Sequence, residues 1–207
     1  MANISEKLWS DFAARYELSA EQASQFQRYY MLLKIWNEKF NLTTITDEAG
    51  ILAYHFEDSV KLGDFYNVKQ SKGIIDVGTG AGFPGIPLKI LYPHVPVILI
   101  EVVQKKVLFL RAVIEELKLQ NIEVCDMDWR TFLRQTQYNA DLVCARASLR
   151  PDELSRMFQP SSHYKNATLV YWATLEYLHE ENLNVIQDVT YTVGEKKRRY
   201  IFLRNKV

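Results

Sequence analysis

The sequence predicts a Rossmann-like α/β protein, with a mostly parallel sheet, helices between the strands and a helical segment in front. Three observations predict this class. Short apolar runs alternate with helical patterns from residue 73 onward. A glycine cluster follows the first of these runs, at the place where ligands bind in such sheets. In residues 1–65 the apolar residues recur at helical spacing, and no strand pattern interrupts them.

Residues 1–65 are therefore expected to form an N-terminal helical extension, and residues 66–207 one compact ligand-binding domain. Ser19 and Gln22 have the spacing of a capping box, which predicts that a helix begins there. One apolar stripe follows, made of Phe26, Tyr29, Tyr30, Leu33, Trp36 and Phe40. Asp47 can cap a further helix.

The second region alternates between the two kinds of element. Strands are predicted at residues 73–77, 95–101, 122–125, 141–145, 167–172, 185–193 and 200–203. Helices are predicted at residues 84–91, 105–117, 152–158 and 175–182. The charged run from Gly194 to Arg199 is expected to be the loop of a terminal hairpin, so at least one strand must be antiparallel.

Composition limits the function classes. Lys plus Arg and Asp plus Glu both number 25, so the formal net charge is zero, whereas a dedicated nucleic-acid binder is usually basic. Any nucleic-acid contact must then depend on local clusters. Cys125 and Cys144 fall in predicted strands and are typical of core thiols in a reducing compartment. The start lacks an apolar signal core and no apolar run could span a bilayer, so we expect a cytoplasmic protein without membrane contact.

The glycine cluster predicts a nucleoside site. Gly78, Gly80 and Gly82 allow positive φ and a close approach of backbone to ligand. Glu101 ends the next strand, about twenty residues on, where a carboxylate can accept hydrogen bonds from ribose hydroxyls. A tight turn in a non-binding α/β protein is the alternative interpretation of the glycines.

The residues around the loop favour one nucleoside. A dinucleotide fingerprint needs glycine at its sixth position, which is Phe83 here, so an NAD-dependent oxidoreductase is disfavoured. A carboxylate at Asp76 would repel a pyrophosphate but suits the ammonium group of an amino acid. The loop therefore predicts S-adenosylmethionine as the cofactor.

Acidic residues also follow the third strand. Asp126 or Asp128 could accept a hydrogen bond from the adenine amino group, with Trp129 beside the base. Alternatively, Asp128 is the N-cap of a short helix that begins at Trp129, and both roles can hold together.

Several segments resemble one known family: residues 36–43, 55–59, 75–88, 105–110, 119–122 and 146–147. The most specific is Gly78-Thr-Gly-Ala-Gly-Phe-Pro-Gly-Ile-Pro-Leu88. From about residue 20 to the C-terminus the chain resembles the glucose-inhibited division protein B family, bacterial enzymes that methylate N7 of a guanine in small-subunit (16S) ribosomal RNA. The resemblance implies a seven-stranded class I methyltransferase sheet with an N-terminal helical extension. It also implies S-adenosylmethionine as cofactor and the ribosomal RNA or the 30S subunit as partner; we expect a monomer.

By position, the family's cofactor contacts fall on Gly78, Phe83, the Trp129-Arg130 pair and Arg146. Guanine N7 carries a free lone pair, so no general base is required and the protein's task is positioning. Arg146 is the candidate for that task, because it follows an apolar strand at the cofactor edge and is expected to meet cofactor or target.

The chain departs from the family at four places. Glu101 stands where the family usually has Asp, and Val102 where it has Ser. Asp128-Trp129-Arg130 replaces Arg-x-Glu, and Trp172-Ala173-Thr174 lacks the lysine of Leu-Lys-Gly. Two main hypotheses therefore stand: an active ribosomal-RNA methyltransferase, or a relative that binds cofactor, RNA or both without turnover. A small-molecule methyltransferase is a further alternative, against which the N-terminal extension argues only through the resemblance.

Two smaller predictions concern charge and metal. Arginines near the carboxyl ends of strands, and above all residues 196–199, are the candidates for RNA phosphate contacts. His55 and Asp58 have the i,i+3 spacing of two metal ligands, but no third ligand is evident. A hydrogen bond from this helix to the core is the favoured interpretation, and no metal is predicted.

Overall fold

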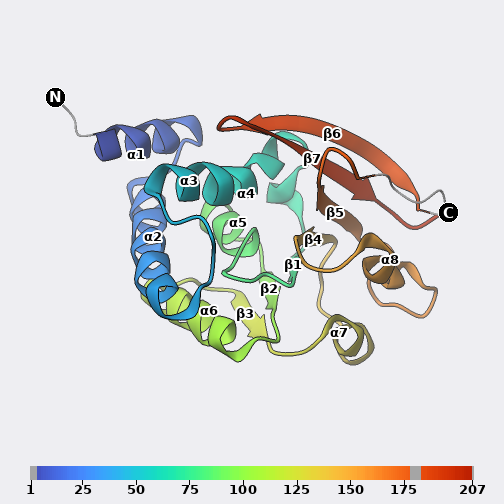
Figure 1. The fold of residues 1–207 in the computed structure, drawn as a ribbon. Coiled ribbons are helices and arrows are strands. Elements are labelled where there is room, and N and C mark those ends of the chain that lie inside the picture. Colours follow the sequence, from blue (N-terminus) through green and yellow to red (C-terminus); the bar gives the residue numbers. More distant parts are fainter. Residues whose placement is uncertain (1–3, 178–182, 207) are drawn as a thin grey trace.

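The computed structural model describes residues 4–177 and 183–206. Its centre is a seven-stranded sheet with the order β3-β2-β1-β4-β5-β7-β6 (Figure 1). The strands are β1 Ile74–Val77, β2 Val97–Ile100, β3 Ile122–Cys125, β4 Leu142–Arg146, β5 Thr168–Ala173, β6 Val185–Val193 and β7 Lys196–Leu203. β1 to β5 pair in parallel, and β7 is antiparallel to both β5 and β6. The predicted mostly parallel, seven-stranded sheet is confirmed.

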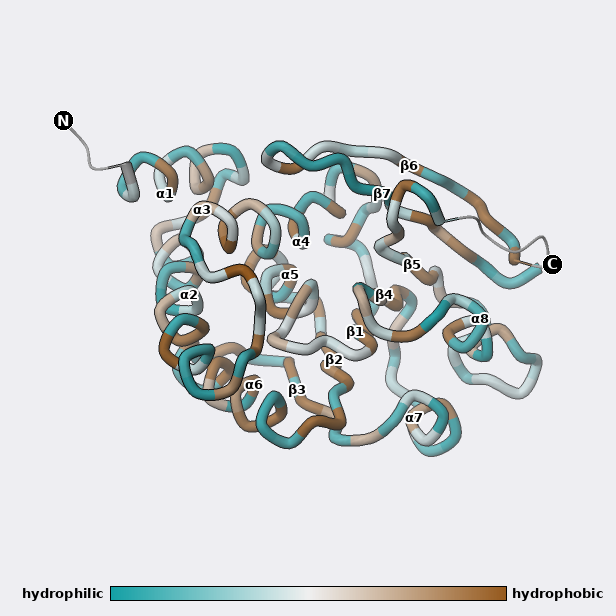
Figure 2. Tube along the Cα trace, viewed as in Figure 1, coloured by the Kyte–Doolittle hydropathy of each residue, from teal (hydrophilic) through white to brown (hydrophobic). Residues whose placement is uncertain are grey.

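Helices cover both faces of this sheet. They are α1 Ile4–Arg15, α2 Ala20–Phe40, α3 Glu48–Ile51, α4 Asp58–Val60, α5 Gly85–Leu91, α6 Gln104–Glu116, α7 Trp129–Gln135 and α8 Pro151–Leu154. A π-helical turn, Leu52–Glu57, joins α3 to α4. Side chains of β1 alternate between two cores: Ile74 packs with the α1–α6 side, and Ile75 with α7 and α8. Apolar residues run along β1, β2 and β4, as buried parallel strands require (Figure 2).

Helix α2 is packed on the glycine loop. Ser19 and Gln22 form the predicted capping box at the start of α2, and Asp47 caps α3. Tyr29 of α2 is fully buried, stacks on Phe83 with 5.5 Å between ring centroids, and donates its hydroxyl to the Ala81 carbonyl. The boundary predicted at residue 65 stays a prediction, and both parts contribute to one hydrophobic core.

The predicted hairpin loop is too long. Only Gly194 and Glu195 form the turn, and Lys196 already pairs with Val193 as the first residue of β7. Gly194 has a φ of 54°, which permits a two-residue connection. The basic residues are accommodated in β7 because Lys196 and Lys197 are exposed at the end of the hairpin, while Arg199 forms an ion pair with Asp188 of β6.

The helix predicted at residues 175–182 is wrong for its first three residues, which form a turn; residues 178–182 lie outside the described residues. The Arg199 guanidinium binds the carbonyls of Leu175 and Tyr177, at 3.3 and 2.7 Å. These carbonyls are therefore used in a tertiary contact instead of a helical ladder.

Cys125 and Cys144 are buried free thiols in β3 and β4, as predicted. Within residues 4–177 and 183–206, no helix has both the length and the apolar character needed to cross a membrane.

Candidate active site

The glycine loop leaves the carboxyl end of β1 and opens onto free space. Gly78 and Gly80 both have a φ of 64°, and Gly82 has a φ of 100°. A Cβ on Gly80 would meet no atom within 4 Å, so a ligand can approach the backbone there. A Cβ on Gly78 would lie 2.5 Å from that of Ser148, so the segment after β4 already covers this part of the loop.

Asp76, in β1, fixes both ends of the glycine loop by hydrogen bonds. Its Oδ2 accepts from the Thr79 hydroxyl at 2.6 Å and from the Gly85 amide at 2.7 Å. Its Oδ1 is buried and has no hydrogen-bond partner. Burial raises the pKa of Asp76 to about 6, against the lowering effect of those two hydrogen bonds. An unpaired carboxylate oxygen beside an open glycine loop fits the ammonium group of the predicted cofactor.

Glu101 connects the end of β2 to the same loop. Its Oε2 accepts from the Gly80 amide at 3.0 Å, and its Oε1 accepts from the amides of Val102 and Val103. A carboxylate has about four acceptor positions, so about one remains for a ribose hydroxyl. The sequence did not reveal that Glu101 also fixes the position of Gly80.

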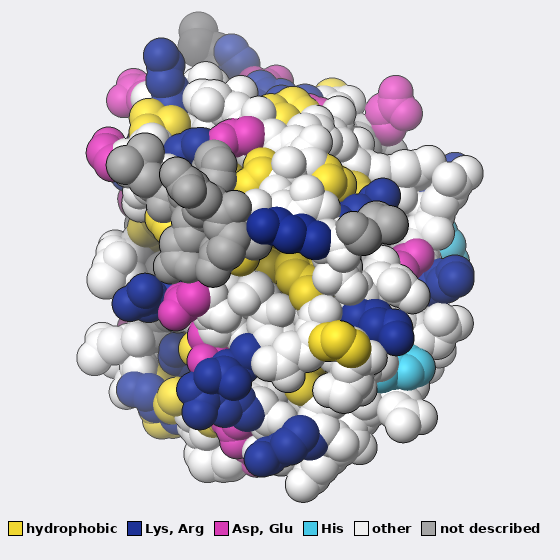
Figure 3. Space-filling model, turned by 90° about the vertical axis from the view of Figure 1, so that its right-hand side faces the viewer, with side chains coloured by type: hydrophobic (Ala, Val, Ile, Leu, Met, Phe, Trp, Pro, Cys, Tyr) yellow, Lys and Arg dark blue, Asp and Glu magenta, His cyan; other side chains and the backbone are white. Residues whose placement is uncertain are grey.

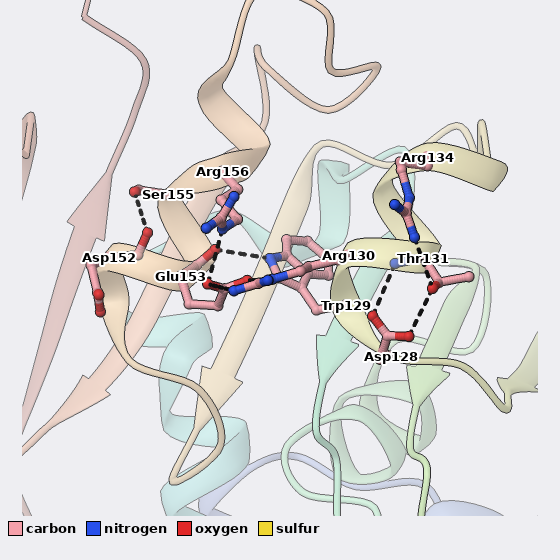
Figure 4. A network of polar contacts seen from close by, with 9 residues as sticks. All are labelled: Asp128, Trp129, Arg130, Thr131, Arg134, Asp152, Glu153, Ser155 and Arg156. Atoms are coloured by element: carbon pink, nitrogen blue, oxygen red, sulfur yellow. Dashed lines mark hydrogen bonds and ion pairs between the residues drawn. The ribbon is translucent and has the colours of Figure 1, made fainter.

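In the turn after β3, the side chains of three predicted cofactor residues form contacts within the protein. The Asp128 carboxylate caps α7 by accepting from the Thr131 amide at 3.0 Å, so the N-cap interpretation is confirmed. Trp129 is buried, and Arg130 forms two hydrogen bonds with Glu153 of α8 (Figure 4). The Asp128 carboxylate is used within α7, and the side chains of Trp129 and Arg130 bind Glu153 of α8. The cofactor role of these three residues stays a prediction.

Arg146 is bound by the N-terminal helical segment. Its guanidinium donates to Asp58 Oδ2 at 2.9 Å and to the Tyr54 carbonyl at 3.2 Å, and lies 2.6 Å from His55 Nδ1. The His55 ring stacks on Phe83 with centroids 4.4 Å apart. Burial and the nearby guanidinium lower the pKa of His55 to about 3, so the ring is neutral and can accept from Arg146.

The core hydrogen bonds predicted for His55 and Asp58 are confirmed, and the described residues contain no group of three metal-ligating side chains. Sequence reasoning missed how many elements Asp58 joins. Its Oδ1 accepts from the Tyr191 hydroxyl at 2.6 Å, and its carbonyl accepts from the Tyr200 hydroxyl at 2.9 Å. These partners are more than 130 residues away, so no local pattern could reveal them.

A cavity of about 730 Å³ lies at the carboxyl ends of β4 and β5. Its wall includes Tyr54, His55, Asp58, Arg146, Trp172, Thr174, Lys197, Arg198 and Arg199. The Lys196 ammonium lies 4.3 Å from the centre of the Tyr54 ring, and the Arg198 guanidinium 5.8 Å. The cavity contains none of the loop glycines, but the His55–Phe83 stack connects the two. We call it the acceptor cavity; aromatic and cationic walls of this kind suit a nucleotide.

The sheet order and the glycine loop at the end of β1 define the class I methyltransferase fold. A solved S-adenosylmethionine-dependent methyltransferase from Aquifex aeolicus has this fold, with a TM-score of 0.58 and 17% identity, covering 79% of this chain and 96% of its own.

The family described as rRNA small subunit methyltransferase G matches residues 22–205, and the chain belongs to this family. Ribosomal RNA small subunit methyltransferase G from Geobacillus thermodenitrificans is 43% identical over 69% of this chain and 61% of its own length. The relative of that name from Staphylococcus aureus is 41% identical over 70% and 61%. The matched segment thus spans about 61% of these relatives.

Proposed function

We propose that the protein transfers the methyl group of S-adenosylmethionine to N7 of a guanine in small-subunit (16S) ribosomal RNA. The acceptor cavity carries this proposal, because it places aromatic and cationic side chains beside the glycine loop. The name of the family and of its relatives, rRNA small subunit methyltransferase G, supports ribosomal RNA as the substrate. We further propose that the protein acts as a monomer in the cytoplasm, on the RNA or the 30S subunit.

The residues on the carboxyl edge of the sheet suit the cofactor. When bound, S-adenosylmethionine supplies an electrophilic methyl group on a sulfonium. Asp76 would hold its ammonium group, Glu101 a ribose hydroxyl, and the backbone of Gly78, Gly80 and Gly82 would line its path. Phe83 and the residues Asp128, Trp129 and Arg130 would contact the rest of the nucleoside.

In the acceptor cavity, the protein's own residues position the target base. Guanine N7 needs no deprotonation, so orientation is the main contribution to rate. Arg146 is held in place by Asp58 and His55, which makes it a preorganised positioning residue at the cavity wall. The end of β5 lacks the lysine that is usual in the family. Lys197 and Arg198 of the neighbouring strand β7 line the same cavity and supply positive charge there instead.

The deciding experiment incubates the protein with labelled S-adenosylmethionine and undermethylated small subunits, in parallel with naked 16S RNA, and maps the product. Label at a guanine N7 is the expected result. Cofactor binding without transfer to either RNA would instead support the family relative without turnover. NAD binding with no S-adenosylmethionine binding would contradict both.

Replacing Glu101 by Ala is expected to weaken cofactor binding at least tenfold, roughly 1.4 kcal/mol. The variant removes the proposed ribose acceptor and frees the Gly80 amide. Calorimetry measures the affinity, and Glu101→Asp, which restores the residue usual in the family, is expected to recover most of it. Wild-type affinity in Glu101→Ala would contradict the assignment.

Cofactor affinity is also expected to depend on pH. Because the pKa of Asp76 is raised to about 6, its carboxyl becomes neutral below that pH and no longer attracts an ammonium group. Affinity should therefore be constant above about pH 7 and fall by up to tenfold per pH unit below about 6. Arg146 opposes this rise in pKa and Glu101 adds to it. Calorimetry between pH 5 and 8 tests this, and Asp76→Asn should bind weakly with a flat profile across that range.

A further inference from the structure

A second hollow, of about 520 Å³, lies between α7 and the segment that follows α8. Its polar wall consists of Arg130, Arg134, Arg156, Gln159, Ser161 and Ser162. We call it the arginine groove. None of the proposed steps of methyl transfer uses these side chains, and it shares no residue with the acceptor cavity.

The groove is positively charged, and two of its three arginines are held in place by Glu153. Glu153 binds Arg130 at 2.6 and 2.9 Å and Arg156 at 2.9 Å (Figure 4). One carboxylate thus serves two guanidinium groups, and hydrogen bonds from Arg130 lower the pKa of Glu153 to about 2, so it stays ionised. Arg134 adds a third positive charge, with a single long hydrogen bond of 3.4 Å to the Thr131 hydroxyl. Asp128, at the start of α7, accepts from the amide and the hydroxyl of Thr131.

The arginines are accessible as well as ordered. The side chains of Arg130 and Arg156 are 61% and 44% exposed. No acidic side chain is among the described residues that line the groove. Lys and Arg side chains on this side of the molecule form separate clusters instead of one basic surface (Figure 3). A partner must then engage particular hollows, because the net charge of zero gives no general attraction.

The position of the groove points to one kind of partner. α7 follows β3 and α8 follows β4, so both helices start at the carboxyl edge, where the glycine loop and the acceptor cavity also lie. Arg130 and Arg134 are four residues apart and stand one turn apart along α7. Cations spaced along a groove suit successive phosphates of one strand better than a single compact anion.

We propose that the arginine groove binds the phosphodiester backbone of the RNA substrate on the α7–α8 side of the target nucleotide. This inference rests on the proposed function. It also assigns a role to a departure from the family: Arg130, standing where Glu is usual, joins Glu153 and Arg156 to build the groove. Phosphate contacts position the strand without reading its sequence.

The test uses the full chain and an unmodified transcript of the small-subunit ribosomal RNA. Arg134→Ala/Arg156→Ala is expected to weaken RNA binding at least tenfold near 0.1 M salt. It should also reduce the slope of log Kd against log salt by about 1 to 2. S-adenosylmethionine affinity should stay unchanged, which shows that the variant is folded. Arg134→Lys/Arg156→Lys keeps both charges and should restore most of the binding.

The matched control removes two charges from the opposite edge of the sheet. Lys72 precedes β1 and Lys118 precedes β3, and both are exposed, so Lys72→Ala/Lys118→Ala should bind RNA like the wild type. Equal losses of RNA affinity in both double variants would contradict the role of the arginine groove. So would an arginine variant with wild-type RNA affinity and wild-type salt dependence. So would a wild-type protein that binds no RNA. If wild type binds RNA without methyl transfer while the arginine variant binds weakly, the groove stands and the proposed activity fails.

Discussion

Replacing Asp58 by Asn is expected to lower the free energy of unfolding by about 3 to 5 kcal/mol. The side chain of Asp58 is 4% exposed and that of Arg146 15%, so the variant leaves a guanidinium in the interior without its counterion. The amide can still accept from the Tyr191 hydroxyl, so the expected loss arises mainly from the ion pair. Urea denaturation followed by circular dichroism measures the change.

Asp64→Asn is the matched control. It removes the ion pair between Asp64 and Lys61, in which the Asp64 side chain is 50% exposed. The free energy of unfolding should therefore fall by less than about 1 kcal/mol. If Asp58→Asn were also within 1 kcal/mol of the wild type, the buried pair would not stabilise the protein as we infer.

Replacing Gly80 by Ala is expected to reduce S-adenosylmethionine affinity on the order of 100-fold, about 2.8 kcal/mol. The new methyl group would project into the open space above the loop, where the structure has no protein atom within 4 Å. That space is where the cofactor would lie, so the clash falls on the ligand and not on the fold. Alanine in the left-handed backbone conformation of Gly80 also strains the folded protein, which should lower the free energy of unfolding by roughly 1 to 2 kcal/mol.

Gly194→Ala separates these two effects. Gly194 also has a positive φ, of 54°, but lies in the β6–β7 turn against Tyr54, away from the glycine loop. It should lose at least as much stability, because its Cβ would also lie 3.1 Å from the Tyr54 ring, and it should bind the cofactor like the wild type in calorimetry. Equal losses of affinity in the two variants would show that strain, and not the occupied space, weakens binding.

Much of the fold was readable from the sequence because its signals are local. The β1 run, the capping box at Ser19 and the N-caps Asp47 and Asp128 each depend on residues within a few positions. The hairpin was predicted, but its loop was predicted too long: a charged run resembles a loop, and only the pairing of Lys196 with Val193 shows that the run belongs to a strand.

The candidate site was predictable only in part. The backbone features of the glycine loop and the acid at the end of β2 have fixed spacing, so their positions followed from the pattern. The environment of Arg146 could not be predicted from any such pattern. Its partners come from residues 54–58, about 90 positions earlier, and their role depends on packing that no local pattern records.

The hydrogen bonds that Asp58 accepts also indicate the order in which parts of the molecule fold. Its partners Tyr191 and Tyr200 follow it by 133 and 142 positions, whereas the glycine loop and Glu101 lie within about 25 residues of each other. Contacts of long sequence separation carry the larger loop-closure cost and form late. During synthesis, the cofactor cradle can therefore be assembled before the wall of the acceptor cavity exists. A chain arrested before β6 would have the glycine loop and Glu101 but would lack Lys197, Arg198 and Arg199 on the wall of the acceptor cavity.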